Sequence, residues 1–233
     1  MTPIRVTAAL GTAGVILPHG APQLDSLLAY AIVLRDGMDP RGIEPIEVPL
    51  ARDGSDDLYL CSVGQYEVDA RSLQFTNRKF PIPEAQCFAE EKMRRINISA
   101  GAEKSYRLPR EVMFLKGDQI TWWAQGDSSQ VRELLKWIEY IGKRRAVGLG
   151  RVLTWFVNEL EEVWPGFPVL HEGRPLRPLP LNYAGVSDDS TLAMAVLSDP
   201  KKGVTRWHHH LQERVWVPYD CEGFGCGRIR IVE

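Results

Sequence analysis

DSSQVRELLKWIEYIGKRRAVGLGRVLTWFV, residues 127–157, contains the clearest helix and the clearest strand of the chain, joined by a basic loop rich in glycine. Asp127 or Ser128 is the expected N-cap, because a short side chain with an acceptor oxygen satisfies the first amides of a helix. The helix is expected to bury one apolar stripe, made of Val131, Leu134, Leu135, Ile138 and Ile141. Residues 152–157, VLTWFV, are mostly β-branched or aromatic and predict a strand.

The N-terminal part predicts a strand, a helix and a second strand. Apolar side chains alternate along residues 4–10, which is the period of a half-buried strand. Residues 11–22 contain the glycines and prolines of a loop. Apolar residues then recur at helical spacing from Leu24 to Leu34, with Gly37 just beyond them. Residues 58–63 predict the second strand, which Gly64 is expected to end.

A long basic insertion follows that second strand. It is expected to be irregular from about Asp69 to Arg110, where it contains three prolines. Residues 112–114 and 120–124, split by KGD, predict a hairpin or a bent strand pair. The order strand, helix, strand, insertion, strand, helix, strand predicts an α+β fold of the ferredoxin-like (RRM-type) βαββαβ kind. The open sheet of that fold is the platform of many RNA-binding modules.

The composition changes near Glu162, since five prolines fall between residues 165 and 180. We therefore expect a domain at 1–162 with an insertion at about 67–111, and a Pro-rich C-terminal lobe at 163–233 with strands near 215–217 and 228–232. No run approaches the roughly 20 apolar residues of a membrane span, and the N-terminus lacks the features of a signal peptide, so a cytoplasmic protein is expected. The four scattered cysteines predict reduced thiols.

The net charge of −2 conceals an uneven distribution of charge. Residues 71–116 contain ten Lys and Arg against five Asp and Glu, and residues 141–151 contain four basic residues and no acid. The rest of the chain is therefore acidic. This division suits a polyanion on one surface and protein neighbours on another. For residues 71–116, where acids are interleaved, ordinary solvated charges explain the pattern equally well.

The loop at residues 142–151, GKRRAVGLGR, has the chemistry of an anion site. Its glycines can adopt positive φ and admit a close neighbour, while backbone amides and three adjacent cations supply counter-charge. An arginine follows Gly142-Lys143 and the loop lies between a helix and a strand, so it is neither a Walker loop nor a Rossmann turn. A tight turn with solubilising charges is the alternative, but three glycines around the cations favour RNA.

The helix, loop and strand at residues 134–152 resemble the glycine-rich loop of the RAMP superfamily of CRISPR proteins, through GKRR at 142–145 and GLG at 148–150. The superfamily resemblance spans roughly residues 1–160. Residues 24–31, LDSLLAYA, and the overall length are similar to the Csf-group RAMP subunit of type IV complexes, the counterpart of the Cas-five family. Many RAMP loops begin with two glycines, whereas this one has Ile141-Gly142, which leaves the subfamily open.

The resemblance implies a structural, crRNA-binding role. Cas-five proteins hold the five-prime handle of the guide RNA, cap one end of the filament of backbone subunits and contact the large subunit. The implied partners are therefore crRNA, backbone RAMP subunits and the large subunit, with target DNA as a further candidate, in a ribonucleoprotein for defence against plasmids or phage. Neither a cofactor nor a membrane is expected.

The resemblance also implies a thumb-like element between the second and third strands, where the basic insertion lies. Phe80, Phe88 and Tyr106 are candidates for stacking on bases there. The expected RNA-binding residues are Gly142, Lys143, Arg144, Arg145, Gly148, Gly150 and Arg151 in the loop, and Arg78, Lys79, Lys92, Arg94, Arg95, Lys104, Arg107 and Arg110 in the insertion.

Catalysis is the alternative function. Some RAMP proteins cut precursor crRNA without metal, by general acid–base catalysis of attack by the 2′-hydroxyl group. His19, which precedes the first helix, is the candidate catalytic residue, with Tyr30 or Lys143 assisting. A lone histidine without an identified second partner favours a protein that binds RNA and does not cut it.

Histidines and cysteines near the C-terminus are the remaining candidate ligands for a metal. Adjacent histidines in a strand point to alternate faces, so at most His208 and His210 share one. Cys221 and Cys226 lie in a glycine-rich tail. Two histidines alone do not make a zinc site. The two cysteines could bind a metal together with them, but we expect no metal site here.

Overall fold

The computed structural model describes residues 1–11, 13–17, 21–38, 46–54, 58–78, 106–180, 183–186, 191–196, 212–217 and 230–231. The chain divides into two compact units. The larger consists of Met1–Ala70 with Met113–Glu233, and the smaller is Arg71–Val112. In the described part of the chain, no helix has the length and apolar run needed to cross a membrane.

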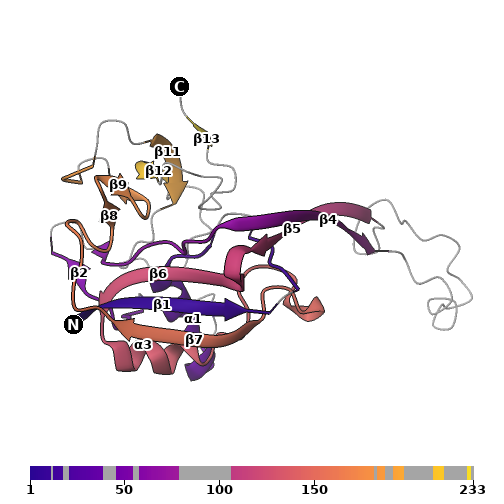
Figure 1. Cartoon of the computed structure of the whole chain (residues 1–233), viewed down its shortest axis with the longest axis horizontal. Helices are drawn as coiled ribbons and strands as arrows, with labels where there is room; N and C mark the ends of the chain where they lie inside the picture. Colours follow the sequence, from indigo (N-terminus) through magenta and orange to yellow (C-terminus); the bar gives the residue numbers. More distant parts are fainter. Residues whose placement is uncertain are drawn as a thin grey trace, which may run out of the picture. The chain divides into compact units, whose positions relative to one another are not determined.

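A three-stranded antiparallel sheet forms the centre of the larger unit. β1 (Thr2–Leu10) lies between β6 (Gln119–Gly126) and β7 (Val152–Glu159), as Figure 1 shows. The alternation expected along β1 is confirmed, because Ile4, Val6 and Ala8 are fully buried. Trp122 from β6 and Val157 from β7 join the same core.

Two helices cover the buried face of this sheet. α1 (Leu24–Asp36) ends at Gly37, whose left-handed backbone (φ 64°) lets its amide and that of Met38 turn back to the carbonyl of Val33. α3 (Ser128–Leu135) is capped by Asp127, whose carboxylate accepts the amides of Ser129 and Gln130 at 3.0 Å each. The mixture of a few helices and antiparallel sheets is compatible with the expected α+β class.

The second helix is shorter than its apolar stripe predicts. It ends at Leu135, and Ile138 and Ile141 enter the core from the turn and irregular segment that follow it. The carbonyl of Glu139 accepts the amide of Val152 at 2.8 Å, and the amide of Ile141 donates to Gly150 at 2.8 Å. Pairing with the start of β7 therefore satisfies the backbone groups that a longer helix would have used.

The second strand also differs from its prediction. β3 (Leu58–Tyr59) pairs with β2 (Arg52–Asp53), and the chain then runs along β6 through isolated bridges at Cys61–Ala124 and Gln65–Thr121. Gly64 does not end this segment. A Cβ atom added there would lie 2.5 Å from the Cβ of Ala21, so the glycine is required for close packing.

The basic insertion is regular where it leaves and rejoins the sheet domain. β4 (Val68–Arg78) and β5 (Tyr106–Leu115) pair as a two-stranded ribbon, so the prediction of an irregular segment from 69 to 110 is wrong at both ends. The predicted hairpin between residues 112–114 and 120–124 is also wrong. These residues belong to different sheets, and the one-turn 3-10 helix at Lys116–Asp118 joins them, with Gly117 at φ 66°.

The C-terminal part forms small antiparallel sheets. β8 (Leu170–His171) pairs with β9 (Arg174–Pro175), and a four-stranded sheet has the order β10-β12-β11-β13. Its strands are β10 (Leu179–Pro180), β11 (Thr191–Val196), β12 (Gln212–Val217) and β13 (Arg230–Ile231). The strands expected near 215–217 and 228–232 are confirmed. Val169, Leu170 and Leu179 form a second core with Leu58.

A fully buried arginine connects this part to the first domain. Arg177 is 0% exposed and donates to the carbonyls of Tyr59 and Cys61, to the Gln23 amide oxygen at 2.7 Å and to Asp25 Oδ2 at 3.2 Å. Asp25 is 4% exposed and lies in the first turn of α1, where a negative charge is favourable. Arg177 therefore fixes residues 164–180 against the segment that runs beside β6.

Candidate nucleic-acid interface

The glycine-rich loop between α3 and β7 has the backbone that its sequence predicts. A one-turn 3-10 helix, Arg145–Val147, is flanked by Arg144 at φ 69° and Gly148 at φ 83°. Gly142 and Gly150 also have positive φ, 84° and 67°. Arg144 is a rare non-glycine residue in this conformation, which costs roughly 1–2 kcal/mol. The loop therefore holds a specific, partly strained shape.

The three glycines of the loop serve two purposes. A Cβ atom on Gly142 would lie 2.4 Å from the carbonyl oxygen of Ile16, and one on Gly150 would lie 1.9 Å from that of Ile141. These two residues thus make room for the protein's own backbone. At Gly148 nothing lies within 4 Å of an added Cβ atom. Space for an external ligand beside a loop glycine is therefore found at Gly148.

Internal hydrogen bonds fix the loop and use several of its amides. Lys143 N–H donates to Ile16 at 3.0 Å, Gly150 N–H to Gly14 at 2.8 Å, and the amides of Val147 and Gly148 close the 3-10 turn. These four amides are occupied by protein carbonyls. The attraction for an anion must therefore come mainly from the side chains.

The side chains of this loop are exposed and basic. Residues 142–147 and Arg151 are exposed, whereas Leu149 and Gly150 are buried and anchor the loop. Nη1 of Arg145 lies 3.5 Å from the hydroxyl oxygen of Tyr30 on α1. In the part of the chain that the structure describes, Lys143, Arg145 and Arg151 pair with no carboxylate. Their charge is thus available to an external anion.

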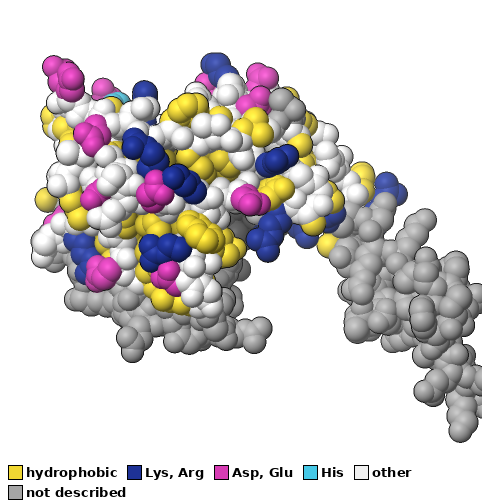
Figure 2. Space-filling model, turned by 90° about the horizontal axis from the view of Figure 1, so that it is seen from below, with side chains coloured by type: hydrophobic (Ala, Val, Ile, Leu, Met, Phe, Trp, Pro, Cys, Tyr) yellow, Lys and Arg dark blue, Asp and Glu magenta, His cyan; other side chains and the backbone are white. Residues whose placement is uncertain are grey.

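Surface charges elsewhere are mixed in sign. Figure 2 shows Lys and Arg side chains interspersed with Asp and Glu over one face of the molecule. The exposed cations Arg35, Lys116 and Lys136 have carboxylate partners at 2.6–2.9 Å, namely Asp36, Glu67 and Glu133. The loop differs from these sites because Lys143 and Arg145 lack a carboxylate partner among the described residues.

The two-stranded ribbon holds three of the other predicted RNA-binding residues, and the structure describes the side chains of two of them, Arg107 and Arg110. Arg107 is exposed, and its guanidinium carbon lies 4.2 Å from the ring centroid of Phe75. Arg110 is exposed next to Glu111, which pairs with Arg71 at 3.3 Å. Leu73 and Phe75 are exposed apolar residues at alternate positions of β4, and sequence reasoning missed this period-two signal.

Several predicted residues lie outside the described segments. Arg78 is the last residue of β4 and Tyr106 the first of β5, but their side chains are not described. The other positions outside the described residues are His19, Lys79, Phe80, Phe88, Lys92, Arg94, Arg95, Lys104, His208, His210, Cys221 and Cys226. Among the described residues, no group of three His, Cys, Asp or Glu side chains is placed to hold a metal ion.

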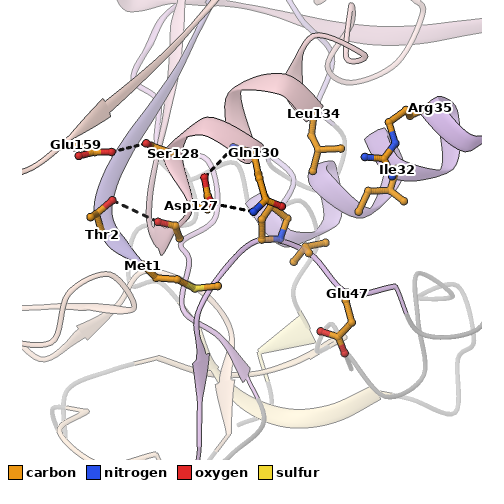
Figure 3. A pocket seen from close by; sticks show the side chains of 13 residues that line it. Met1, Thr2, Ile32, Arg35, Glu47, Asp127, Ser128, Gln130, Leu134 and Glu159 are labelled. Atoms are coloured by element: carbon orange, nitrogen blue, oxygen red, sulfur yellow. Dashed lines mark hydrogen bonds between the residues drawn. The ribbon is translucent and has the colours of Figure 1, made fainter.

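A cavity in the described structure lies at the other end of the sheet. It has a volume of about 590 Å³ and is lined by residues from the start of β1, the last turn of α1 and the first turn of α3 (Figure 3). Its polar groups are engaged internally: Asp127 caps α3, and the hydroxyl of Ser128 donates to Glu159. Sequence reasoning did not predict this cavity, which is separate from the basic loop.

The family of the chain is shown by comparison of its sequence with family models. The model described as CRISPR type IV associated protein Csf3 matches residues 73–201, more than half of the chain. The match includes most of the ribbon, β6, α3, the basic loop and β7. A comparison with curated proteins finds no match. On the family match, the chain belongs to the Csf3 family of CRISPR type IV associated proteins.

Proposed function

We propose that this protein is the crRNA-binding structural subunit of a type IV CRISPR ribonucleoprotein. In this proposal it holds the five-prime handle of the guide RNA, caps the filament of backbone subunits and contacts the large subunit. Membership of a type IV associated family supports a place in such a complex. The exposed basic loop supports RNA as the ligand.

The observation that carries the proposal is the fixed backbone of the basic loop, which holds exposed cationic side chains. Four backbone hydrogen bonds and two close glycine contacts set its shape before any ligand arrives. A preorganised loop loses little conformational entropy on binding. Lys143 and Arg145 then offer charges that a ribose-phosphate chain can neutralise, with release of its counterions.

The proposed platform is a ferredoxin-like sheet. The segment at residues 61–65 lies beside β6, which gives the order β7, β1, β6 and then this segment. α1 connects β1 to this segment, and α3 connects β6 to β7. These connections support the βαββαβ arrangement, with the ribbon inserted between its second and third strands. RNA-binding modules commonly use such a sheet.

The ribbon provides a second proposed contact with RNA. The Phe75 ring and the Arg107 guanidinium lie against each other, and both groups stack readily on nucleobases. Arg78, Lys79, Lys92, Arg94, Arg95, Lys104 and Arg110 are the further phosphate ligands in this proposal.

Removal of the loop cations tests the proposal. The variant Lys143→Ala/Arg144→Ala/Arg145→Ala should bind a repeat-derived RNA oligonucleotide more weakly. Its slope of log Kd against log salt should be shallower by about 2, since each phosphate contact on a single strand contributes about 0.7. The control is Arg35→Ala/Lys116→Ala/Lys136→Ala, which removes the same charge from sites that have carboxylate partners. Equal affinity and slope in the two variants would rule out the loop as the binding site.

We also propose that the protein binds RNA without cutting it. The test is incubation of the purified protein with repeat RNA in EDTA, followed by electrophoresis of the RNA. Intact RNA is the expected result. Cleavage that disappears in His19→Ala would overturn this part of the proposal and establish the endoribonuclease alternative.

A further inference from the structure

The exposed face of the central sheet contains an aromatic ring among polar side chains. On β1, Ile4, Val6 and Ala8 point into the core, so Arg5 and Thr7 lie on the opposite face. The antiparallel register places Phe156 of β7 opposite Thr7, and Asn158 opposite Arg5. Thr154 is two residues before Phe156, on the same face.

The ring of Phe156 is open to solvent, although it lies in the middle of a strand. Phe156 is 50% exposed, whereas Val157, the next residue, is 5% exposed. Trp123 on β6 lies on the same face, opposite Arg5, but the ring of Trp164 packs against it edge-on at 5.2 Å. The protein thus covers one aromatic ring of this face and leaves the other open.

The neighbours of Phe156 suit a nucleobase better than an apolar protein surface. Arg5, Thr7, Thr154 and Asn158 offer a cation, two hydroxyls and an amide, and none of the described residues paired on this face of β1 and β7 is a carboxylate. A base needs a flat ring to stack on and hydrogen-bonding groups at its edges. A single ring surrounded by polar groups provides both.

The outer edge of β7 is partly closed to another protein strand. Arg132 of α3 donates to the Val157 carbonyl at 2.9 Å, and the Val152 amide donates to Glu139 at 2.8 Å. These bonds use backbone groups that a partner strand would need for edge pairing. They leave the ring on the face of the strand untouched.

We propose that the face of β1 and β7 around Phe156 is a stacking site for an unpaired base of bound RNA. This inference rests on the proposed function, because the RNA chain reaches the site from the basic loop. β7 starts at Val152, directly after exposed Arg151, and Phe156 is about 17 Å from Arg151 at about 3.3 Å per residue. The loop holds phosphates, the ring holds a base, and Arg5 binds the phosphate or base beside it.

The test uses RNA oligonucleotides that contain 2-aminopurine, whose fluorescence is quenched when it stacks. With the full-length protein, one position along the repeat-derived RNA should be quenched on binding. Phe156→Ala should remove that quenching and weaken binding about 5- to 100-fold, while the salt slope stays the same. Phe156→Tyr should restore both, because a phenol ring stacks as well. Leu34→Ala, an exposed apolar residue of α1, is the control and should bind as the unmodified protein does.

The outcomes separate this inference from the proposed function. If the unmodified protein binds RNA through the loop but Phe156→Ala retains full affinity and quenching, the stacking site is refuted and the proposed function stands. If Phe156→Ala weakens binding equally for an RNA that lacks the quenched base, the ring does not stack and the inference fails. If Phe156→Ala releases a partner protein from the complex while RNA binding is unchanged, the face binds protein and the stacking inference is overturned. If the unmodified protein does not bind RNA, both proposals fail.

Discussion

The two arginine sites of the larger unit make an instructive contrast. Arg177 is 0% exposed and meets a carboxylate, an amide oxygen and two backbone carbonyls. Arg145 is exposed, and its nearest described hydrogen-bond partner is a tyrosine hydroxyl at 3.5 Å. The protein surrounds the first cation with its own hydrogen-bond acceptors and leaves the second available to an external ligand.

The difference shows which cations maintain the fold and which are free to bind. A buried charge is tolerated only when partners replace its water, so the partners of Arg177 belong to the architecture. An exposed charge on a fixed loop needs no such compensation, and its position suits the binding of an external ligand. The predictions below test this distinction, from the largest expected effect to the smallest.

Breaking the buried pair should cause the largest loss of stability. Asp25→Ala leaves the Arg177 charge without its carboxylate, which costs about 3–5 kcal/mol in the free energy of unfolding. Urea denaturation followed by circular dichroism measures this loss of unfolding free energy. Asp25→Ala/Arg177→Met should recover much of the loss, because no unpaired charge then remains. A loss below about 1 kcal/mol in the single variant would mean that Arg177 is not an architectural residue.

Substitution of the loop glycines by alanine should have a severe effect at Gly150 and a mild effect at Gly148. Gly150→Ala places a Cβ atom on the Ile141 carbonyl, so it should both destabilise the protein and weaken RNA binding. Gly148→Ala meets no neighbour and should cost only the roughly 1–2 kcal/mol of a positive φ. Thermal melts and RNA titrations of both variants check this order. Equal effects at the two sites would contradict the assignment of Gly150 to internal packing.

The cap of α3 should give a smaller, pH-dependent effect. Hydrogen bonds from Ser129 and Gln130 lower the pKa of Asp127 to about 2. A depressed pKa stabilises the folded state fully above the ordinary value of 3.8, and this contribution is lost as pH falls toward 2. Asp127→Asn should keep a cap but lose this pH dependence, which melting curves at pH 7 and pH 2.5 can show. If the melting temperature of Asp127→Asn depended on pH as that of the unmodified protein does, this explanation would be contradicted.

The smallest effect is expected at Cys61, whose thiol should hardly react with an alkylating reagent in the folded protein. Burial raises the pKa of its thiol to about 12, so very little thiolate exists near neutral pH. Iodoacetamide at pH 8 should leave Cys61 unmodified in native protein and modify it in urea, as peptide mass spectrometry would report. Rapid native alkylation would mean that the core around Arg177 opens readily.

Local signals predicted much of the fold. Alternation gave β1, the Gly37 cap ended α1, Asp127 capped α3, and glycines predicted the positive φ angles of the loop. Failures arose where tertiary contacts override a local pattern. Residues 139–141 pair with the start of β7 and therefore lie outside the helix. Gly64 permits close packing, at a position where the end of a strand was predicted. Arg177 had no local signal, since its partners are more than 100 residues away.

The candidate site was only partly accessible from sequence. The basic loop was found because its cations and glycines are adjacent in the chain. Phe156 was not, because its neighbours Thr7 and Arg5 come from a strand that is far away in sequence and register alone brings them together. The occupied amides and the carbonyl contacts of Gly142 and Gly150 likewise required coordinates.

Ultraviolet crosslinking of the bound guide RNA, followed by mass spectrometry of the attached peptides, tests the central claim most directly. We predict crosslinks within residues 143–156, which hold the loop cations and Phe156, and their loss in the triple alanine variant of the loop. Crosslinks confined to other segments, with residues 143–156 free of RNA, would contradict the account.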